Sequence, residues 1–179
     1  PRTCAWHASF SDSFATVLLI TIALENKKLA EYVVDNNDEH SSDQLHDAVV
    51  SAVEYAVKHL DVRNIIVMGH SNCGGIHGLL HPEVVSKEPY ISRWLCLAHP
   101  VLEELEHEDP DEPADVRAEL LEGTVLQSID SLLSYDWVKS RVDAGTLALH
   151  ALYYDLASGT MYVWNAEAED FEATKLSEL

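Results

Sequence analysis

The stretch Ile65-Ile66-Val67-Met68-Gly69-His70-Ser71-Asn72-Cys73-Gly74-Gly75 holds the most informative pattern in the chain. Its first four residues are apolar, which is typical of a strand that is buried on both faces. An imidazole, His70, and a thiol, Cys73, follow three residues apart. Both side chains are ligands that suit Zn²⁺, and Gly74 and Gly75 are expected to let the backbone turn tightly beside them. The stretch therefore predicts half of a metal site on the turn that leaves a buried strand.

The remainder of the chain alternates between segments typical of strands and segments typical of helices. Strands are predicted over residues 2–10, 29–34, 64–68, 146–154 and 161–165. Helices are predicted over residues 14–28, 41–60, 90–105 (interrupted near residues 99–100) and 114–133, with an acidic loop over residues 103–115. This order predicts one α/β domain over residues 1–179, with a mostly parallel central sheet flanked by helices and a C-terminal hairpin at its edge.

The charge of the chain is its compositional outlier. It has 31 acidic and 11 basic residues among 179, a net charge of −20. Nucleic acid and anionic membranes are not expected as partners, because both are bound through clustered Lys and Arg. The longest apolar run, residues 14–24, is shorter than the roughly 18 residues of a membrane-spanning helix. Three separated cysteines, Cys4, Cys73 and Cys96, argue against a disulfide framework and suit a reducing compartment such as the cytoplasm or an organelle matrix.

The motif and three further segments resemble β-class carbonic anhydrases. His70 and Cys73 lie in a match to the family's G-H-S-x-C-G-G, and residues 60–67 resemble the strand that enters it. Residues 145–159 resemble the closing hairpin G-x-L-x-L-H-G-x-x-Y-D-x-x-x-G, and residues 122–125 stand where the family often has E-x-N-V. The resemblance covers about residues 2–171. It implies a zinc lyase that hydrates CO₂ to bicarbonate, with its site at or near a dimer interface.

The first metal motif of that family, Cys-Ser-Asp-Ser-Arg, falls on Phe10-Ser11-Asp12-Ser13-Phe14. The resemblance implies that His70 and Cys73 are zinc ligands and that Asp12 is the acid that accepts a hydrogen bond from the hydroxide nucleophile. Phe10 replaces the first thiolate ligand, and Phe14 replaces the arginine that pairs with the acid. The family segment R-N-A-G-N falls near residues 35–39 and is also altered. The sequence is thus identified as a divergent member with a rewritten first motif.

Three outcomes for this site stay open from the sequence. Without its arginine, Asp12 must protonate, reach solvent or bind a cation, because a buried unpaired charge costs several kcal/mol. In the first outcome Asp12 completes an Asp/His/Cys zinc site. In the second the two phenylalanines fill a metal-free pocket. In the third Cys4 or His7 replaces the lost ligand, although Cys4 lies six residues back, roughly 20 Å along an extended strand.

Three functions follow from these outcomes. The favoured one is a divergent carbonic-anhydrase-like protein with little or no ordinary CO₂ hydration, because two substitutions fall in one five-residue motif. The alternative is an active zinc lyase that hydrates CO₂ or another small electrophile. The third is an apolar pocket, formed by Phe10 and Phe14 beside Gly74 and Gly75, for an organic ligand. We expect CO₂ or bicarbonate as the substrate of an active form, and pairing with a second copy or with a paralogue.

Three other histidines are not expected to be metal ligands or catalysts. His77 and His81, spaced four residues apart, are expected at the surface or at the rim of the pocket. His150 is expected inside a strand, as a satisfied core group rather than a catalyst. Cys96 is expected in a helix core.

Overall fold

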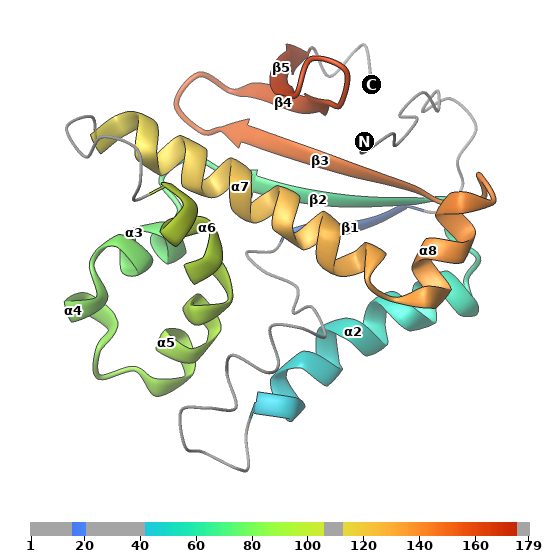
Figure 1. Ribbon diagram of the computed structural model, residues 1–179, viewed down its shortest axis with the longest axis horizontal. Helices are drawn as coiled ribbons and strands as arrows, with labels where there is room; N and C mark the ends of the chain where they lie inside the picture. The colour runs from blue at the N-terminus through green and yellow to red at the C-terminus, as the bar shows by residue number, and fades with distance from the viewer. Residues whose placement is uncertain (1–15, 21–41, 106–112, 175–179) are drawn as a thin grey trace.

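The computed structural model describes residues 16–20, 42–105 and 113–174, and side chains over residues 49–105 and 116–174. The described strands form one sheet in the order β1-β2-β3-β4-β5 (Figure 1). They are β1 (Thr16–Ile20), β2 (Asn64–His70), β3 (Ala148–Asp155), β4 (Thr160–Asn165) and β5 (Asp170–Thr174). The β1–β2 and β2–β3 pairs are parallel, and the β3–β4 and β4–β5 pairs are antiparallel. The predicted α/β fold, a sheet flanked by helices with a C-terminal hairpin at its edge, is confirmed.

Strand β1 corrects the helix predicted over residues 14–28. It runs parallel to β2, with Thr16 opposite Asn64 and Ile20 opposite Met68. A short apolar run looks alike in a buried strand and in a buried helix, so periodicity could not separate them. Its β-branched residues and its backbone pairing with β2 favour the strand. The strands predicted over residues 2–10 and 29–34 lie outside the described residues.

Two long helices carry much of the described core. Helix α2 (Ser42–Lys58) and helix α7 (Pro113–Leu133) occupy two of the predicted helical segments. The larger core cluster joins α2, β2, β3, α7 and the short helix α8 (Asp136–Asp143). Its buried members include Val53, Ile65, Val67, Val125, Ile129, Leu132 and Leu149. The second cluster joins α7 to the short helices that follow β2. Helix α7 therefore links the sheet to the region that surrounds the turn after β2.

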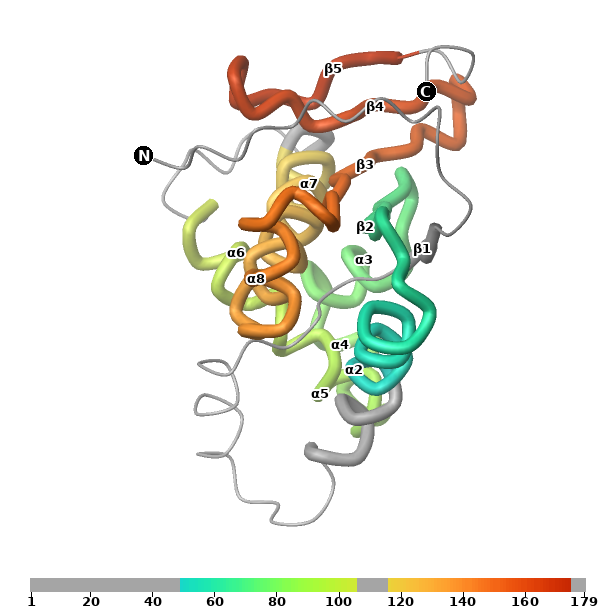
Figure 2. The backbone as a smooth tube through the Cα atoms, turned by 90° about the vertical axis from the view of Figure 1, so that its right-hand side faces the viewer, coloured from blue at the N-terminus to red at the C-terminus, as the bar shows by residue number. Residues whose placement is uncertain are grey.

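The short helices between β2 and α7 depart in detail from the prediction. They are α3 (Gly74–Leu80), α4 (Pro82–Val85), α5 (Pro89–Leu95), the 3₁₀ turn η2 (Cys96–Ala98) and α6 (His99–Leu105). The predicted interruption falls at η2, three residues earlier than expected, and partly buried Cys96 begins this turn. Part of the loop predicted over residues 103–115 is helical instead, because α6 extends to Leu105 and α7 begins at Pro113. Figure 2 shows α4 and α5 at the end of the molecule opposite β4 and β5.

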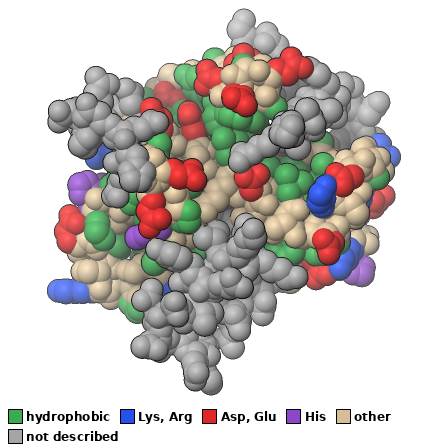
Figure 3. Space-filling view, viewed as in Figure 1, with side chains coloured by type: hydrophobic (Ala, Val, Ile, Leu, Met, Phe, Trp, Pro, Cys, Tyr) green, Lys and Arg blue, Asp and Glu red, His purple; other side chains and the backbone are tan. Residues whose placement is uncertain are grey.

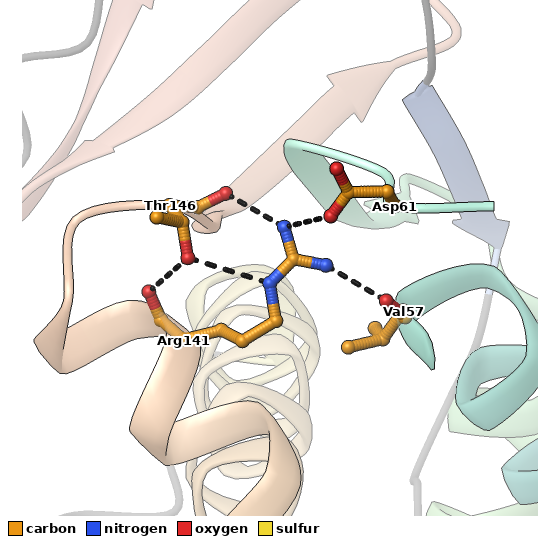
Figure 4. Close-up of polar contacts among 4 residues, drawn as sticks. All are labelled: Val57, Asp61, Arg141 and Thr146. Atoms are coloured by element: carbon orange, nitrogen blue, oxygen red, sulfur yellow. Dashed lines mark hydrogen bonds and ion pairs between the residues drawn. The ribbon is translucent and has the colours of Figure 1, made fainter. Parts of the chain in front are cut away.

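Helix α8 (Asp136–Asp143) was not predicted, and it holds a polar junction (Figure 4). Arg141 donates from Nη1 to the Val57 carbonyl at 2.7 Å, near the end of α2. Its Nη2 donates to the Thr146 carbonyl at 3.1 Å and lies 2.8 Å from Oδ1 of Asp61. One guanidinium thus joins the end of α2, the turn into β2 and the connection from α8 to β3.

Candidate metal site at the carboxyl end of β2

His70 is the last residue of β2, and its ring is held in one tautomer. Nδ1 lies 3.0 Å from the carbonyl oxygen of Ser71. A carbonyl can only accept, so Nδ1 carries the proton and donates it. The lone pair of Nε2 is then available, which is the arrangement that orients a metal-binding imidazole.

Cys73 follows at the end of a tight turn, and the turn differs from the one expected. Its strained residue is Asn72, whose φ is 57°, in the left-handed region that asparagine tolerates. Gly74 and Gly75 have no positive φ and instead begin α3. Cys73 is extended (φ −64°, ψ 124°) and partly exposed. The expectation that the two glycines make the turn is therefore wrong; Asn72 makes it.

His70 and Cys73 line the same cavity, whose volume is about 390 Å³. The lining comes from the turn after β2, from α3, from α7 and from the end of β3. Its described residues are His70, Ser71, Asn72, Cys73, Ile76, His77, Arg117, Ala118, Leu121 and Tyr153. His77 is exposed and lies on this cavity, and its ring packs against that of His81 in a tilted arrangement, with 4.6 Å between centroids. The placement of these two histidines at the surface and rim is confirmed.

Gly69 explains how α7 comes to cover this cavity. A Cβ on Gly69 would lie 2.9 Å from Cγ2 of Val125 and 3.0 Å from Cγ of Leu121. The first distance is shorter than real carbon contacts and the second is at their lower limit, so an alanine here would force α7 or these side chains to shift. Leu121 itself lines the cavity. The glycine before His70 therefore allows the helix to lie close over the turn that carries His70.

Ser71 ties the turn to the hairpin of β3 and β4. Its backbone N–H donates to the Tyr154 carbonyl at 2.9 Å, and its hydroxyl accepts from the Leu156 N–H at 2.8 Å. Hydrogen bonds from Ser158, from Ser71 and from nearby backbone N–H groups lower the pKa of Asp155 to about 2. Burial, and then the charge of Asp155, raise the pKa of Tyr153. Tyr153 therefore presents a protonated phenol to the cavity near neutral pH.

His150 is a satisfied core group, as expected. It lies in β3, and its Nε2 is 2.9 Å from Oδ1 of Asn64 in β2. Burial lowers the pKa of His150, because the charged imidazolium loses its hydration. His150 is not among the residues that line the cavity.

Comparison with known proteins gives the chain its family. The family model described as carbonic anhydrase matches residues 25–161. A carbonic anhydrase of Helicobacter pylori (strain J99) is 35% identical over 131 residues, which are 70% of this chain and 59% of the relative. Beta carbonic anhydrase 3 of Arabidopsis thaliana is 32% identical over 136 residues, which are 74% of this chain and 53% of the relative. The chain belongs to the β-class carbonic anhydrase family.

Solved β-carbonic anhydrases share the fold. The β-carbonic anhydrase CcaA has a TM-score of 0.63 and 29% identity, over 70% of this chain and 57% of that chain. One of two tetrameric β-carbonic anhydrases of Sordaria macrospora has a TM-score of 0.58 at 22% identity, over 72% of this chain and 62% of that chain, which speaks for the fold alone. The chain spans about three fifths or less of the length of the curated relatives it matches.

Two of the predicted zinc ligands, His70 and Cys73, lie together among the described residues. Imidazole nitrogen and thiolate sulfur are suitable zinc ligands, and both line one cavity. Over the described ranges, no group of three His, Cys, Asp or Glu residues could hold a metal ion. The predicted third ligand, Asp12, and the predicted pocket residues, Phe10 and Phe14, lie outside the described residues and before the matched stretch. The altered first motif therefore stays a prediction.

Sequence reasoning missed several residues of the cavity, among them Tyr153, Leu121 and Arg117. Tyr153 could have been predicted from the pairing of the two strands, because it stands opposite Gly69 in the β2–β3 register and so lies beside the motif. Leu121 and Arg117 lie on α7, four residues apart on one helical face. No signal in the sequence indicates which turn of α7 packs over the motif, since that depends on the approach at Gly69.

Proposed function

We propose that the protein is a β-carbonic-anhydrase-like zinc-binding protein with little or no ordinary CO₂ hydration. The observation that carries this is the pairing of His70 and Cys73 on one cavity, with the His70 ring already held through Nδ1. The rewritten first motif, Phe10 to Phe14, supports the loss of activity, because the thiolate and the arginine of the family pattern are replaced. The family chemistry uses five groups: three zinc ligands, the acid and its arginine. Two of the five, His70 and Cys73, are thus retained among the described residues.

Asp12 is proposed as the third ligand, and the position of β1 makes this a demanding proposal. In a parallel sheet, the residues that follow the strands gather at one edge. His70 and Cys73 follow β2, whereas Asp12 precedes β1 by four residues. Thr16, the first residue of β1, pairs with Asn64, six residues before His70. Thr16 and His70 therefore lie about 20 Å apart along the strand direction. The chain before Thr16 would have to turn back along the sheet for Asp12 to bind beside His70.

The residues of the chain would act around a bound zinc as follows. A zinc ion supplies Lewis acidity that allows water to attack CO₂ near neutral pH. The Ser71 carbonyl keeps the His70 tautomer that offers Nε2, and Cys73 would offer its thiolate. Tyr153 can donate a hydrogen bond from its phenol into the cavity. An Asp12 that binds the metal cannot also accept a hydrogen bond from the attacking water, so we expect slow turnover.

The first test is the metal content of the full chain, purified without chelators and measured by elemental analysis. We expect zinc to bind in the wild type, and we expect Cys73→Ser and Asp12→Asn to weaken it at least about tenfold. Cys96→Ser is the matched control, because Cys96 does not line the cavity, and it should leave zinc binding unchanged. Zinc-loaded protein should hydrate CO₂ at or near the uncatalysed rate in stopped-flow assays.

Each result decides between the readings. Absence of zinc from the wild type would overturn the metal proposal and favour a pocket for an organic ligand. Zinc binding that Asp12→Asn leaves intact would remove Asp12 as a ligand. Rapid CO₂ hydration by the wild type would overturn the proposed loss of activity.

An active zinc lyase is the second candidate. It is favoured by the cavity itself, which brings His70, Cys73 and the protonated phenol of Tyr153 together. CO₂ and bicarbonate would be its substrates. The double variant Phe10→Cys with Phe14→Arg separates the candidates: a gain in CO₂ hydration indicates that only the first motif was lost. No gain, in a variant that binds zinc, would assign the loss to other segments such as residues 35–39.

Pairing with a second copy or with a paralogue is also proposed. Val84, Tyr90 and Ile91 are large apolar side chains with exposed fractions of 56%, 66% and 44%, on α4 and α5. Light scattering on the purified chain would measure its mass in solution.

None of the helices in the described part of the chain is long and apolar enough to cross a membrane.

A further inference from the structure

The cavity differs in charge from the rest of the chain. Of the 179 residues 31 are acidic, and red carboxylates are scattered over the face shown in Figure 3. The described lining of the cavity nevertheless contains no Asp or Glu. It contains one guanidinium, that of Arg117, and two imidazoles, those of His70 and His77. Among the described residues, the lining itself therefore carries no carboxylate, unlike the acidic surface around it.

Arg117 differs from three other basic residues of the described chain, because it has no carboxylate partner there. Lys58, Lys139 and Arg141 each lie within ion-pair distance of a carboxylate. Over the described ranges no hydrogen bond or ion pair involves Arg117, which is exposed. Its charge is thus not neutralised by the described neighbours.

The position of Arg117 over the cavity is fixed by the packing of α7. Leu121 lies one helical turn further on, and its side chain is held against Gly69. Residues four apart share a helical face, so the contact at Gly69 also orients Arg117 toward the turn that carries His70 and Cys73. The phenol of Tyr153 adds a donor on the same lining.

We propose that Arg117 is a positioning residue that admits and holds small oxyanions or carboxylates in this cavity, beside Cys73. A guanidinium offers a planar pair of N–H donors that matches a carboxylate or bicarbonate. The long side chain at the exposed end of the cavity attracts such anions through an otherwise repulsive acidic surface. This inference rests on the proposed function for the identity of the cavity, but it requires no bound metal.

Cys73 provides the probe, in the full chain with no metal added. Iodoacetate and iodoacetamide alkylate the same thiolate: sulfur bonds to the methylene carbon and iodide leaves. The two reagents differ in charge. The ratio of their rate constants at Cys73, followed by mass spectrometry, is therefore independent of the fraction of thiolate. Arg117→Gln should lower the iodoacetate/iodoacetamide ratio about threefold or more, and Arg117→Lys should retain part of it.

The control is Arg63→Gln, because Arg63 is exposed, is absent from the lining and precedes β2 at its other end. It makes the same change in net charge and should leave the ratio within the error of the wild type. Bicarbonate should slow the reaction of Cys73 with iodoacetamide in the wild type more than in Arg117→Gln. High salt should bring the wild-type ratio toward that of Arg117→Gln, because it screens exposed charges.

Equal ratios in the wild type and Arg117→Gln would overturn the proposal, and so would an equal fall in Arg63→Gln. A Cys73 that reacts with neither reagent would also overturn it, because the cavity would then be closed to small molecules. These outcomes are separate from the zinc test. Zinc binding with an unchanged ratio removes the role of Arg117 alone, and a changed ratio without zinc binding leaves an anion site that uses no metal.

Discussion

Arg141→Ala is the perturbation whose cost can be worked most directly from the structure. The guanidinium of Arg141 donates to the carbonyl of Val57, a residue that is 2% exposed and next to last in α2. Carbonyls at the end of a helix have no partner within the helix. A hydrogen bond to a charged group contributes about 1.5–3 kcal/mol, and an unsatisfied buried carbonyl costs a similar amount.

The other contacts of Arg141 add less. The Thr146 carbonyl belongs to an exposed residue and can bind water in the variant. The carboxylate of Asp61 is 83% exposed, and surface ion pairs contribute only about 0–1 kcal/mol. We therefore expect Arg141→Ala to lower the free energy of unfolding by about 2–3 kcal/mol, which corresponds to a fall in Tm of roughly 4–12 °C for a chain of this size.

Urea unfolding followed by circular dichroism measures this cost. Arg141→Lys keeps the charge but not the planar guanidinium, so its free energy of unfolding should lie between those of the wild type and Arg141→Ala. Asp61→Asn removes only the exposed ion pair and should cost less than about 1 kcal/mol. If Asp61→Asn were as costly as Arg141→Ala, the ion pair rather than the Val57 carbonyl would be the main contribution, and the reasoning would be wrong.

Three further predictions concern packing and pH. Gly69→Ala should lower the free energy of unfolding by about 1–3 kcal/mol through overpacking, whereas Gly74→Ala, which meets no atom within 4 Å, should be near neutral; urea unfolding compares the two. Gly123→Ala would place a Cβ 2.5 Å from Cγ1 of Val101 and should lower Tm through this clash. Adding Val101→Ala should recover part of that loss. If the Tm losses of the two single variants simply add in the double variant, the clash is refuted. Burial lowers the pKa of His150, so below about pH 6.5 the unfolded chain binds more protons than the folded chain. The free energy of unfolding should therefore decrease from pH 7 to pH 5.5, and it should decrease less in His150→Gln. Urea titrations at both pH values measure the two changes.

The parts of the fold that the sequence predicted are those with dense local signals. The apolar run of β2 and the turn into β4, with Gly159 at φ 71°, gave strands close to the observed ones. Strand β5 was missed because Phe171 is its only buried residue. Helix α8 was missed because eight residues are too few to show a helical pattern of apolar side chains.

The site was predictable where its chemistry lies within one turn. His70 and Cys73 are three residues apart, so their spacing alone placed them on one cavity. The roles of the glycines were misassigned because the left-handed residue is Asn72, which only the backbone shows. Arg117 lies 44 positions beyond Cys73 in the sequence, on a separate helix, and its arrival at the cavity depends on packing at Gly69.

Ser71 gives the hairpin a role at a distance. Three of its atoms are engaged at once: its carbonyl holds the imidazole of His70, its N–H binds Tyr154, and its hydroxyl accepts from Leu156, 85 residues along the chain. Rotation of the imidazole away from its present orientation would disturb the same residue that anchors the hairpin. Deuterium uptake at the Leu156 amide should therefore report whether the turn from His70 to Cys73 is ordered or has opened.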